Sequence, residues 1–279
     1  MPFHFPSREE KRLKKEKGEQ SYSFKEYGLL LLKSQEYSEM QALILYYFSQ
    51  KYKDSMIAFF PDSFIQDVKN RNKYLKISRK DFQIIWLCDG HGGGKLSFPL
   101  NFWESFEKNK DKERFYVISC HLWTCPRSQG GHASILIYKR DTNTVERFEP
   151  NGLCAVKDEW YDSPACDREL GNMFLSYNIK YLSPQSPEKG WQRLQIESLD
   201  EISSQDKERI TKEELLLNEG FCVVWTYVFL EIVIQNPNLT TKKIHNILVN
   251  ELTKNSITYL TFIKTHAIGL IKNACNLFH

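Results

Sequence analysis

The stretch GGHASILIYKRDTNTVERFEPNG, residues 130–152, decides the fold that we expect for this chain. Its segments SILIYK and TVERFEP are rich in β-branched and aromatic residues, and the polar sequence RDTN joins them. This pattern predicts an antiparallel β-hairpin. His132 opens the first strand and Glu149 ends the second, so we expect the two side chains at the same edge of the sheet.

Three further segments on either side of the hairpin have the composition of strands. They are DFQIIWLCD (81–89), RFYVISCHLW (114–123) and NIKYLS (178–183). Helical patterns precede and follow this block. The sequence therefore predicts an α+β fold with a central, mostly antiparallel sheet flanked by helices.

The segment 22–76 is expected to be mostly helical, most clearly at 37–52, where Ser38 and Gln41 suggest a capping box. Residues 222–235 predict a fully buried helix that Asn236-Pro237 ends. A polar stretch from Ser183 has a helical pattern only near its end. From residue 240, after a cap at Thr240 or Thr241, we expect one or two amphipathic helices on the outside.

A length of 279 residues suits one large domain or two small ones. We divide the chain into a charged arm at 1–20 and a single catalytic domain at 21–279. Within that domain we expect a mostly helical part at 21–100, the core at 101–237 and the final helices at 238–279.

The charge and cysteine content limit the possible functions. Thirty-eight basic and 35 acidic residues give a net charge of +3, too balanced to favour nucleic acid as a partner. Seven cysteines without a framework spacing favour a reducing compartment, and no apolar run is long enough to span a membrane. The N-terminus lacks the apolar core of a signal peptide, so we expect a cytosolic protein, in the cell that makes it or in another.

Two other motifs are interpreted as structural. GHGGGK at 90–95 does not satisfy the phosphate-loop pattern, because Asp89 stands at the first glycine position and Leu96 follows the lysine. Cys120, His121 and Cys125 lack the spacing of a zinc site. We therefore expect a turn in the first place, and neither a metal nor an organic cofactor.

The stretch GFCVVWTYVF (220–229) supplies a nucleophile for the hairpin. Cys222 stands where the buried helix begins, and a helix N-terminus and a nearby imidazolium both favour thiolate over thiol. A carboxylate from Glu149 would fix the tautomer of His132 and leave its other nitrogen for the thiol proton. A core cysteine and a structural histidine are the alternative interpretations of these two residues.

The two motifs together resemble the His–acid–Gln–Cys cysteine proteases, a group that includes the SUMO proteases and the adenoviral protease. The hairpin is similar to that of the adenoviral protease and of homologues from large DNA viruses, with Glu in a Phe-Glu-Pro context. GFCVVWTYVFLEIVIQNP is similar to their nucleophile helix. The resemblance covers residues 113–237 and implies a papain-like fold.

This resemblance implies a role for four residues. Cys222 would be the nucleophile, His132 the general base and acid, and Glu149 the orienting group, with Asn151 ranked second for that role. A glutamine would stabilise the oxyanion together with the backbone N–H of Cys222. No glutamine stands at 214–221, so Gln192 in Gly-Trp-Gln is expected to take this place, ahead of Gln195 and Gln185. The residues between Gln192 and Cys222 would then form an insertion that loops out near the site.

Substrate-binding residues are also expected from the resemblance. Ala133 follows the histidine where SUMO proteases often have a tryptophan that covers the substrate tail. Another aromatic residue would have to narrow the channel. Trp123 and Trp191 are expected there together with Gly131, and ordinary core tryptophans are the alternative.

The resemblance implies a monomeric cysteine isopeptidase, a deubiquitinase or ubiquitin-like protein protease. Its partners would be ubiquitin or a ubiquitin-like modifier and their conjugates. It also implies a pathogen or viral protein that acts in the cytosol of a eukaryotic host. Three alternatives stay open: an acetyltransferase with the same triad, a viral-type polyprotein peptidase, and an inactive module that binds ubiquitin-like proteins.

Overall fold

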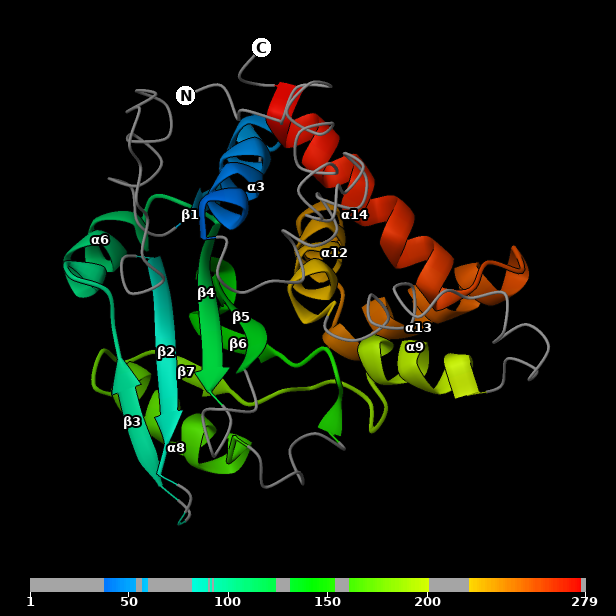
Figure 1. The fold of residues 1–279 in the computed structure, drawn as a ribbon. Helices are drawn as coiled ribbons and strands as arrows, with labels where there is room; N and C mark the ends of the chain where they lie inside the picture. The colour runs from blue at the N-terminus through cyan, green and yellow to red at the C-terminus, as the bar shows by residue number, and fades with distance from the viewer. Residues whose placement is uncertain are drawn as a thin grey trace, which may run out of the picture.

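The computed structural model describes residues 38–53, 57–59, 82–89, 91, 93–123, 131–153, 161–200 and 221–276. These residues form an α+β structure around one seven-stranded sheet (Figure 1). The sheet runs in the order β3-β2-β4-β5-β6-β7, and β1 pairs separately with β4. The strands are β1 (Ile57–Phe59), β2 (Gln83–Cys88), β3 (Gly94–Ser97), β4 (Phe115–Trp123), β5 (Gly131–Lys139), β6 (Thr144–Phe148) and β7 (Lys180–Leu182).

The sheet is mixed, which corrects the expectation of a mostly antiparallel one. β1 and β2 run parallel to β4, and β7 runs parallel to β6. Two helices occupy the crossovers that these pairings require: α6 (Phe102–Asn109) before β4, and α8 (Ser163–Leu175) between β6 and β7. Both helices were missed in the sequence, and a parallel pair needs a connection of this length.

The predicted hairpin is present. β5 and β6 are antiparallel from Ile135 opposite Phe148 to Lys139 opposite Thr144. The short 3-10 helix Arg140–Thr142 and the left-handed Asn143 form the turn between them. Glu149 directly follows the last residue of β6, and His132 is the second residue of β5.

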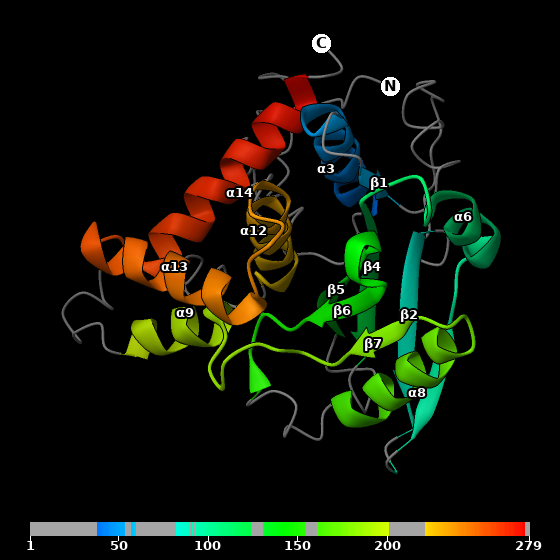
Figure 2. The same cartoon turned by 180° about the vertical axis from the view of Figure 1, so that it is seen from behind.

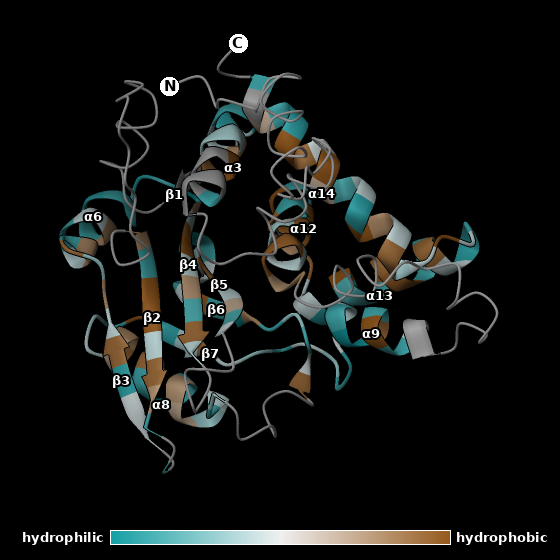
Figure 3. Cartoon of the chain, viewed as in Figure 1, coloured by the Kyte–Doolittle hydropathy of each residue, from teal (hydrophilic) through white to brown (hydrophobic). Residues whose placement is uncertain are grey.

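One face of the sheet is covered by α12 (Cys222–Gln235), the buried helix that was predicted, and by helices packed around it. These are α3 (Ser38–Lys51), α13 (Thr241–Lys254) and α14 (Tyr259–Asn276) (Figures 1 and 3). Thr240 caps α13, as expected, because its side chain accepts a hydrogen bond from the Lys243 N–H. The opposite face of the sheet is covered by α6 and α8 (Figure 2). These two helices form a second apolar core with the side chains of β2, β4, β5 and β6 that point toward them, and we call this the α8 side of the sheet.

The N-terminal part contributes both helix and strand to the described structure. Of the described residues in 21–100, those of α3 are helical, and those of β1, β2 and β3 belong to the sheet. α3 begins at Ser38, as the sequence predicts, and Gln41 Oε1 accepts a hydrogen bond from Gln83 Nε2 at 2.6 Å, which links the helix to β2. The predicted turn follows β2, since the Asp89 carboxylate accepts hydrogen bonds from the His91 and Gly93 N–H groups, and Gly94 and Lys95 already belong to β3.

A helix also begins earlier than predicted in the polar stretch after Ser183. α9 (Trp191–Asp200) includes the first residues of the expected insertion, and the rest of it lies outside the described residues, as does the arm at 1–20. Trp191 and Gln195, one turn apart, are both buried and dock α9 on α12. None of the helices in the described ranges is long and apolar enough to cross a membrane.

Candidate active site

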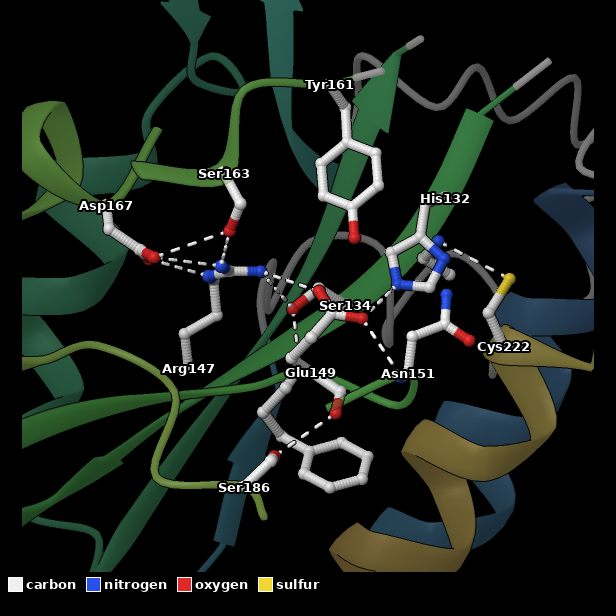
Figure 4. Close-up of polar contacts among 12 residues, drawn as sticks. His132, Ser134, Arg147, Glu149, Asn151, Tyr161, Ser163, Asp167, Ser186 and Cys222 are labelled. Carbon is white, nitrogen blue, oxygen red and sulfur yellow. Dashed lines mark hydrogen bonds and ion pairs between the residues drawn. The ribbon is translucent and has the colours of Figure 1, made fainter. Parts of the chain in front are cut away.

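The hairpin brings His132 and Glu149 into direct contact (Figure 4). His132 Nε2 donates to Glu149 Oε1 at 2.6 Å. The pair is buried, and the Glu149 side chain is wholly inaccessible to solvent. This bond occupies Nε2, so Nδ1 is the ring nitrogen that remains for a second partner.

Cys222 is that second partner. It is the first residue of α12, which packs against β5. Cys222 lies beside the His132 ring and helps to raise its pKa, and the Cys222 Sγ accepts the backbone N–H of Ala133 at 3.4 Å. A thiolate here would therefore have an imidazole, a backbone donor and a helix N-terminus beside it.

The charges of this pair favour an imidazolium. Burial acts to lower the pKa of His132, but the Glu149 carboxylate and the hydrogen bond to Cys222 outweigh it and raise that pKa to about 10. Burial likewise opposes ionisation of Glu149, yet His132, Arg147 and the Asn151 N–H hold its pKa below the ordinary value. The arrangement can hold a protonated base next to a thiol.

The other buried cysteines in the described part of the chain differ. Burial raises the pKa of the Cys120 thiol to about 12 and also raises that of Cys166. Both lie in the apolar core on the α8 side, and they are expected to remain neutral thiols. No cluster of three His, Cys, Asp or Glu side chains suitable for a metal occurs within the described ranges, although Cys125 falls outside them.

Two glycines fix Gln192 next to the triad. Gly152 has φ +84°, and a methyl group there would lie 2.2 Å from the Gly190 nitrogen. This close approach lets Gly190 N–H donate to Asn151 O and Gln192 N–H donate to Pro150 O. The first turn of α9 is thereby attached to the turn that follows Glu149.

Gln192 is a buried glutamine of α9 that lies close to the turn after Glu149. The residue is buried, and its Oε1 has no hydrogen-bond partner in the part of the chain that the structure describes. A buried amide in this state retains unused bonding capacity. Its two rivals are accounted for: Gln195 Oε1 accepts from Trp225 Nε1 at 2.8 Å in the core, and the exposed Gln185 donates to Ser183 O.

Asn151 does not replace Glu149 as the orienting group. Its backbone N–H donates to Glu149 Oε1 at 3.1 Å, and its side chain points toward His132 and Cys222 (Figure 4). Glu149 alone of the two supplies a carboxylate to the ring.

The structure separates the two expected channel tryptophans. Trp191 is only 1% exposed and packs against Phe148, Trp225 and His245, so the expectation that it lines a substrate channel is wrong. Trp123 is partly exposed at the end of β4, opposite Gly131 in the strand register. Trp123 and Gly131 therefore lie at the same edge of the sheet as His132, where a substrate tail is expected.

Sequence reasoning missed the residues behind the triad. Arg147 is fully buried and donates to Glu149 Oε2 at 3.1 Å, and Asp167 of α8 binds its other side. The ring of Tyr161 stacks on the His132 ring, with centroids 5.3 Å apart. Strand alternation contained a signal for one of them, because Arg147 shares its face with Val145 and Glu149.

No protein-family model matches the chain. The chain is 23% identical over 201 residues to a protein of Acanthamoeba polyphaga mimivirus described as an ankyrin repeat protein. The match covers 67% of this chain and 24% of that protein, so the chain spans about a quarter of its length. The similarity relates the chain to one part of a longer viral protein and assigns no residue a role.

Proposed function

We propose that this protein is a cysteine isopeptidase with a papain-like arrangement of Cys222, His132 and Glu149, and that it removes ubiquitin or a ubiquitin-like modifier from conjugates. The observation that carries the proposal is the buried His132–Glu149 hydrogen bond with Cys222 at the other side of the ring. A structural histidine or a core cysteine would not need this combination.

The chemistry follows from these contacts. The Cys222 thiolate attacks the carbonyl carbon of the C-terminal glycine, and the oxyanion that forms accepts hydrogen bonds from the Cys222 N–H and the Gln192 amide. His132 donates its proton to the departing lysine amine, which leaves an acyl-enzyme. Water then attacks the thioester, His132 takes the proton of the water, and the modifier is released.

A Gly-Gly tail is the substrate feature that suits this edge of the sheet. Trp123 and Gly131 lie at that edge, and a tail without Cβ atoms would pass through a channel there that is too narrow for other residues. The similarity to a mimivirus protein supports a viral source. Action in the cytosol of a host cell is part of the proposal.

The experiment is reaction of the purified protein with ubiquitin, SUMO and other ubiquitin-like proteins that bear a C-terminal electrophile. We expect a covalent adduct with one of them, absent in Cys222→Ala and formed at the wild-type rate in Cys120→Ala, the matched buried cysteine. If no modifier forms an adduct, the isopeptidase proposal is wrong. Polyprotein cleavage, acetyl transfer and binding without catalysis are then the next functions to test.

A further inference from the structure

The burial of the charged Arg147 side chain costs desolvation free energy, and nothing in the packing of β6 requires a charge at this position. An unpaired buried charge is strongly destabilising, and a buried ion pair seldom stabilises more than apolar residues of the same volume. Arg147 nevertheless has a side-chain exposure of 0% and lies on β6 among apolar neighbours.

All the donors of this guanidinium are used. Nε and Nη2 donate to the two carboxylate oxygens of Asp167 at 2.7 and 2.9 Å. Nη1 donates to Glu149 Oε2 at 3.1 Å and to Ser134 Oγ at 3.4 Å, and Nη2 also donates to Ser163 Oγ. Tyr181 donates to Asp167 Oδ1 at 2.5 Å. One continuous chain of bonds thus runs from Tyr181 of β7 and Asp167 of α8 to the imidazole, and Figure 4 shows it from Asp167 onward.

We propose that Arg147 and Asp167 are positioning residues for the triad, which act as one neutral unit. Arg147 holds the second oxygen of Glu149 so that the first oxygen points at His132. Asp167 cancels the charge of Arg147 so that the guanidinium does not repel the imidazolium on the other side of Glu149. This inference rests on the proposed function, because it assigns the pair a task within that site.

The charge balance supports the second half of this proposal. Two cations, Arg147 and the His132 imidazolium, face two anions, Glu149 and Asp167, so the buried set is neutral only when His132 is protonated. In a medium of low dielectric, removal of one of these charges changes the energy of the imidazolium strongly.

Other titratable groups face the same set from every neighbouring element. Burial raises the pKa of three of them, so they stay neutral near pH 7, while Tyr161 stacks on the His132 ring and Cys222 lies beside it. The three neutral groups are Cys120 of β4, Cys166 of α8 and Tyr181 of β7.

The test uses the alkylation midpoint, defined as the pH at which Cys222 reacts with iodoacetamide at half its maximal rate, measured on the Cys222 peptide by mass spectrometry. Asp167→Asn keeps the shape of the side chain and removes its charge. Arg147 is then uncompensated and competes with His132 for Glu149. We expect the midpoint to rise by about one pH unit, which is a tenfold slower reaction at a pH well below it.

The double variant Arg147→Met/Asp167→Asn distinguishes positioning from a structural role. It restores the charge balance, so the midpoint should return to within a few tenths of a pH unit of the wild-type value. The rate of adduct formation with the modifier should stay below the wild-type rate, because Oε2 of Glu149 has lost its donor. The matched control is the exposed pair Arg114–Asp141, whose double variant Arg114→Met/Asp141→Asn should change neither quantity.

Three outcomes would overturn the proposal: an unchanged midpoint in Asp167→Asn, a double variant whose midpoint is no closer to the wild type, or a shift in the surface control. If Asp167→Asn does not fold, Tyr181→Phe removes a donor to Asp167 and must shift the midpoint upward by a smaller amount. The midpoint needs no modifier. A shifted midpoint without any adduct supports the positioning role and rejects the isopeptidase, whereas an adduct with an unshifted midpoint does the opposite.

Discussion

The two faces of the β5–β6 hairpin bury different kinds of side chain. On the α12 face, Ala133, Ile135, Ile137 and Phe148 pack into an apolar core around the nucleophile helix. The α8 face of the hairpin instead carries polar and charged side chains that are joined by hydrogen bonds and ion pairs. These are His132, Ser134, Arg147 and Glu149. One face positions the nucleophile by packing and the other positions the base by hydrogen bonds. The comparison predicts that variants on the first face change stability and variants on the second change the chemistry of Cys222.

The largest expected effect comes from Glu149→Gln on the α8 face. The amide cannot hold an imidazolium as the carboxylate does, and a comparable change in a catalytic triad lowers kcat by about 10⁴-fold. We expect a loss of this order in the rate of adduct formation, measured by gel or mass spectrometry.

The same strand contains a matched control on the opposite face. Glu146 is buried and bonds Lys139 and Thr241 rather than the triad. Glu146→Gln should therefore keep the rate within a few-fold of the wild type and lower the thermal midpoint through the contact with α13. Equal losses of activity in the two variants would contradict the division between the faces.

The second prediction concerns the apolar face. Leu230 lies two turns beyond Cys222 in α12 and is fully buried, so Leu230→Ala should lower the free energy of unfolding by about 2–5 kcal/mol, measured by urea denaturation. Leu170→Ala on α8 is the matched deletion and should cost a similar amount. Neither removes a charge, so neither should move the alkylation midpoint. A shift in either one would contradict the division, because packing would then also set the state of the thiol.

The third prediction separates the two buried glutamines of α9. Gln192→Ala should lower the rate of adduct formation by about 10²–10³-fold, the cost of removing one oxyanion donor, with little loss of stability. Gln195→Ala should have the reverse effect, because its side chain binds Trp225 in the core. Rates and thermal midpoints of both variants give the answer. If Gln195→Ala alone slows the reaction, Gln192 is not the oxyanion residue.

The sequence predicted these elements to different extents, and the reason is physical. The hairpin and α12 follow from local patterns, because alternation, a polar turn and a continuous apolar run each specify their own element. Local pattern also placed Glu149 beside His132. The mixed sheet was not predictable in this way, since the parallel pairing of β2 with β4 depends on a crossover rather than on either strand.

The errors at the site have the same origin. Trp191 and Gln192 are adjacent in sequence, and only the docking of α9 decides that the tryptophan enters the core while the glutamine keeps an unbonded oxygen. Asp167 lies 20 residues from Arg147, in a helix that the strand pattern did not reveal. An inward-facing arginine in TVERF was visible in the sequence, but its partner was not.

The fourth prediction places a pH dependence of stability on the α8 face alone. The folded protein raises the pKa of His132 from 6.5 to about 10, so the stabilisation from its proton is complete below pH 6.5 and is lost as the pH rises to about 10. In Cys222→Ala the Glu149 carboxylate still raises the pKa of His132 but the contribution of Cys222 is lost, so this window ends at a lower pH. We expect the contribution of the His132 proton to the unfolding free energy to fall across it by at most about 1.4 kcal/mol per pH unit, the limit for one proton. The Cys222→Ala background removes the titrating thiol.

In Cys222→Ala/Glu149→Gln the unfolding free energy should fall much less between pH 6.5 and 10, because the carboxylate that holds the His132 proton is gone. Lysines and tyrosines titrate equally in both proteins, and the pKa of His245 on the α12 face is lowered by burial to about 4, so that residue is neutral throughout. The pKa of Glu149 lies below its ordinary value, and its own contribution is lost only as the pH falls below this window. Parallel urea curves from pH 6.5 to 10 would mean that His132 binds its proton no more tightly in the folded chain. The buried charges of the α8 face would then hold the ring in place without setting its charge.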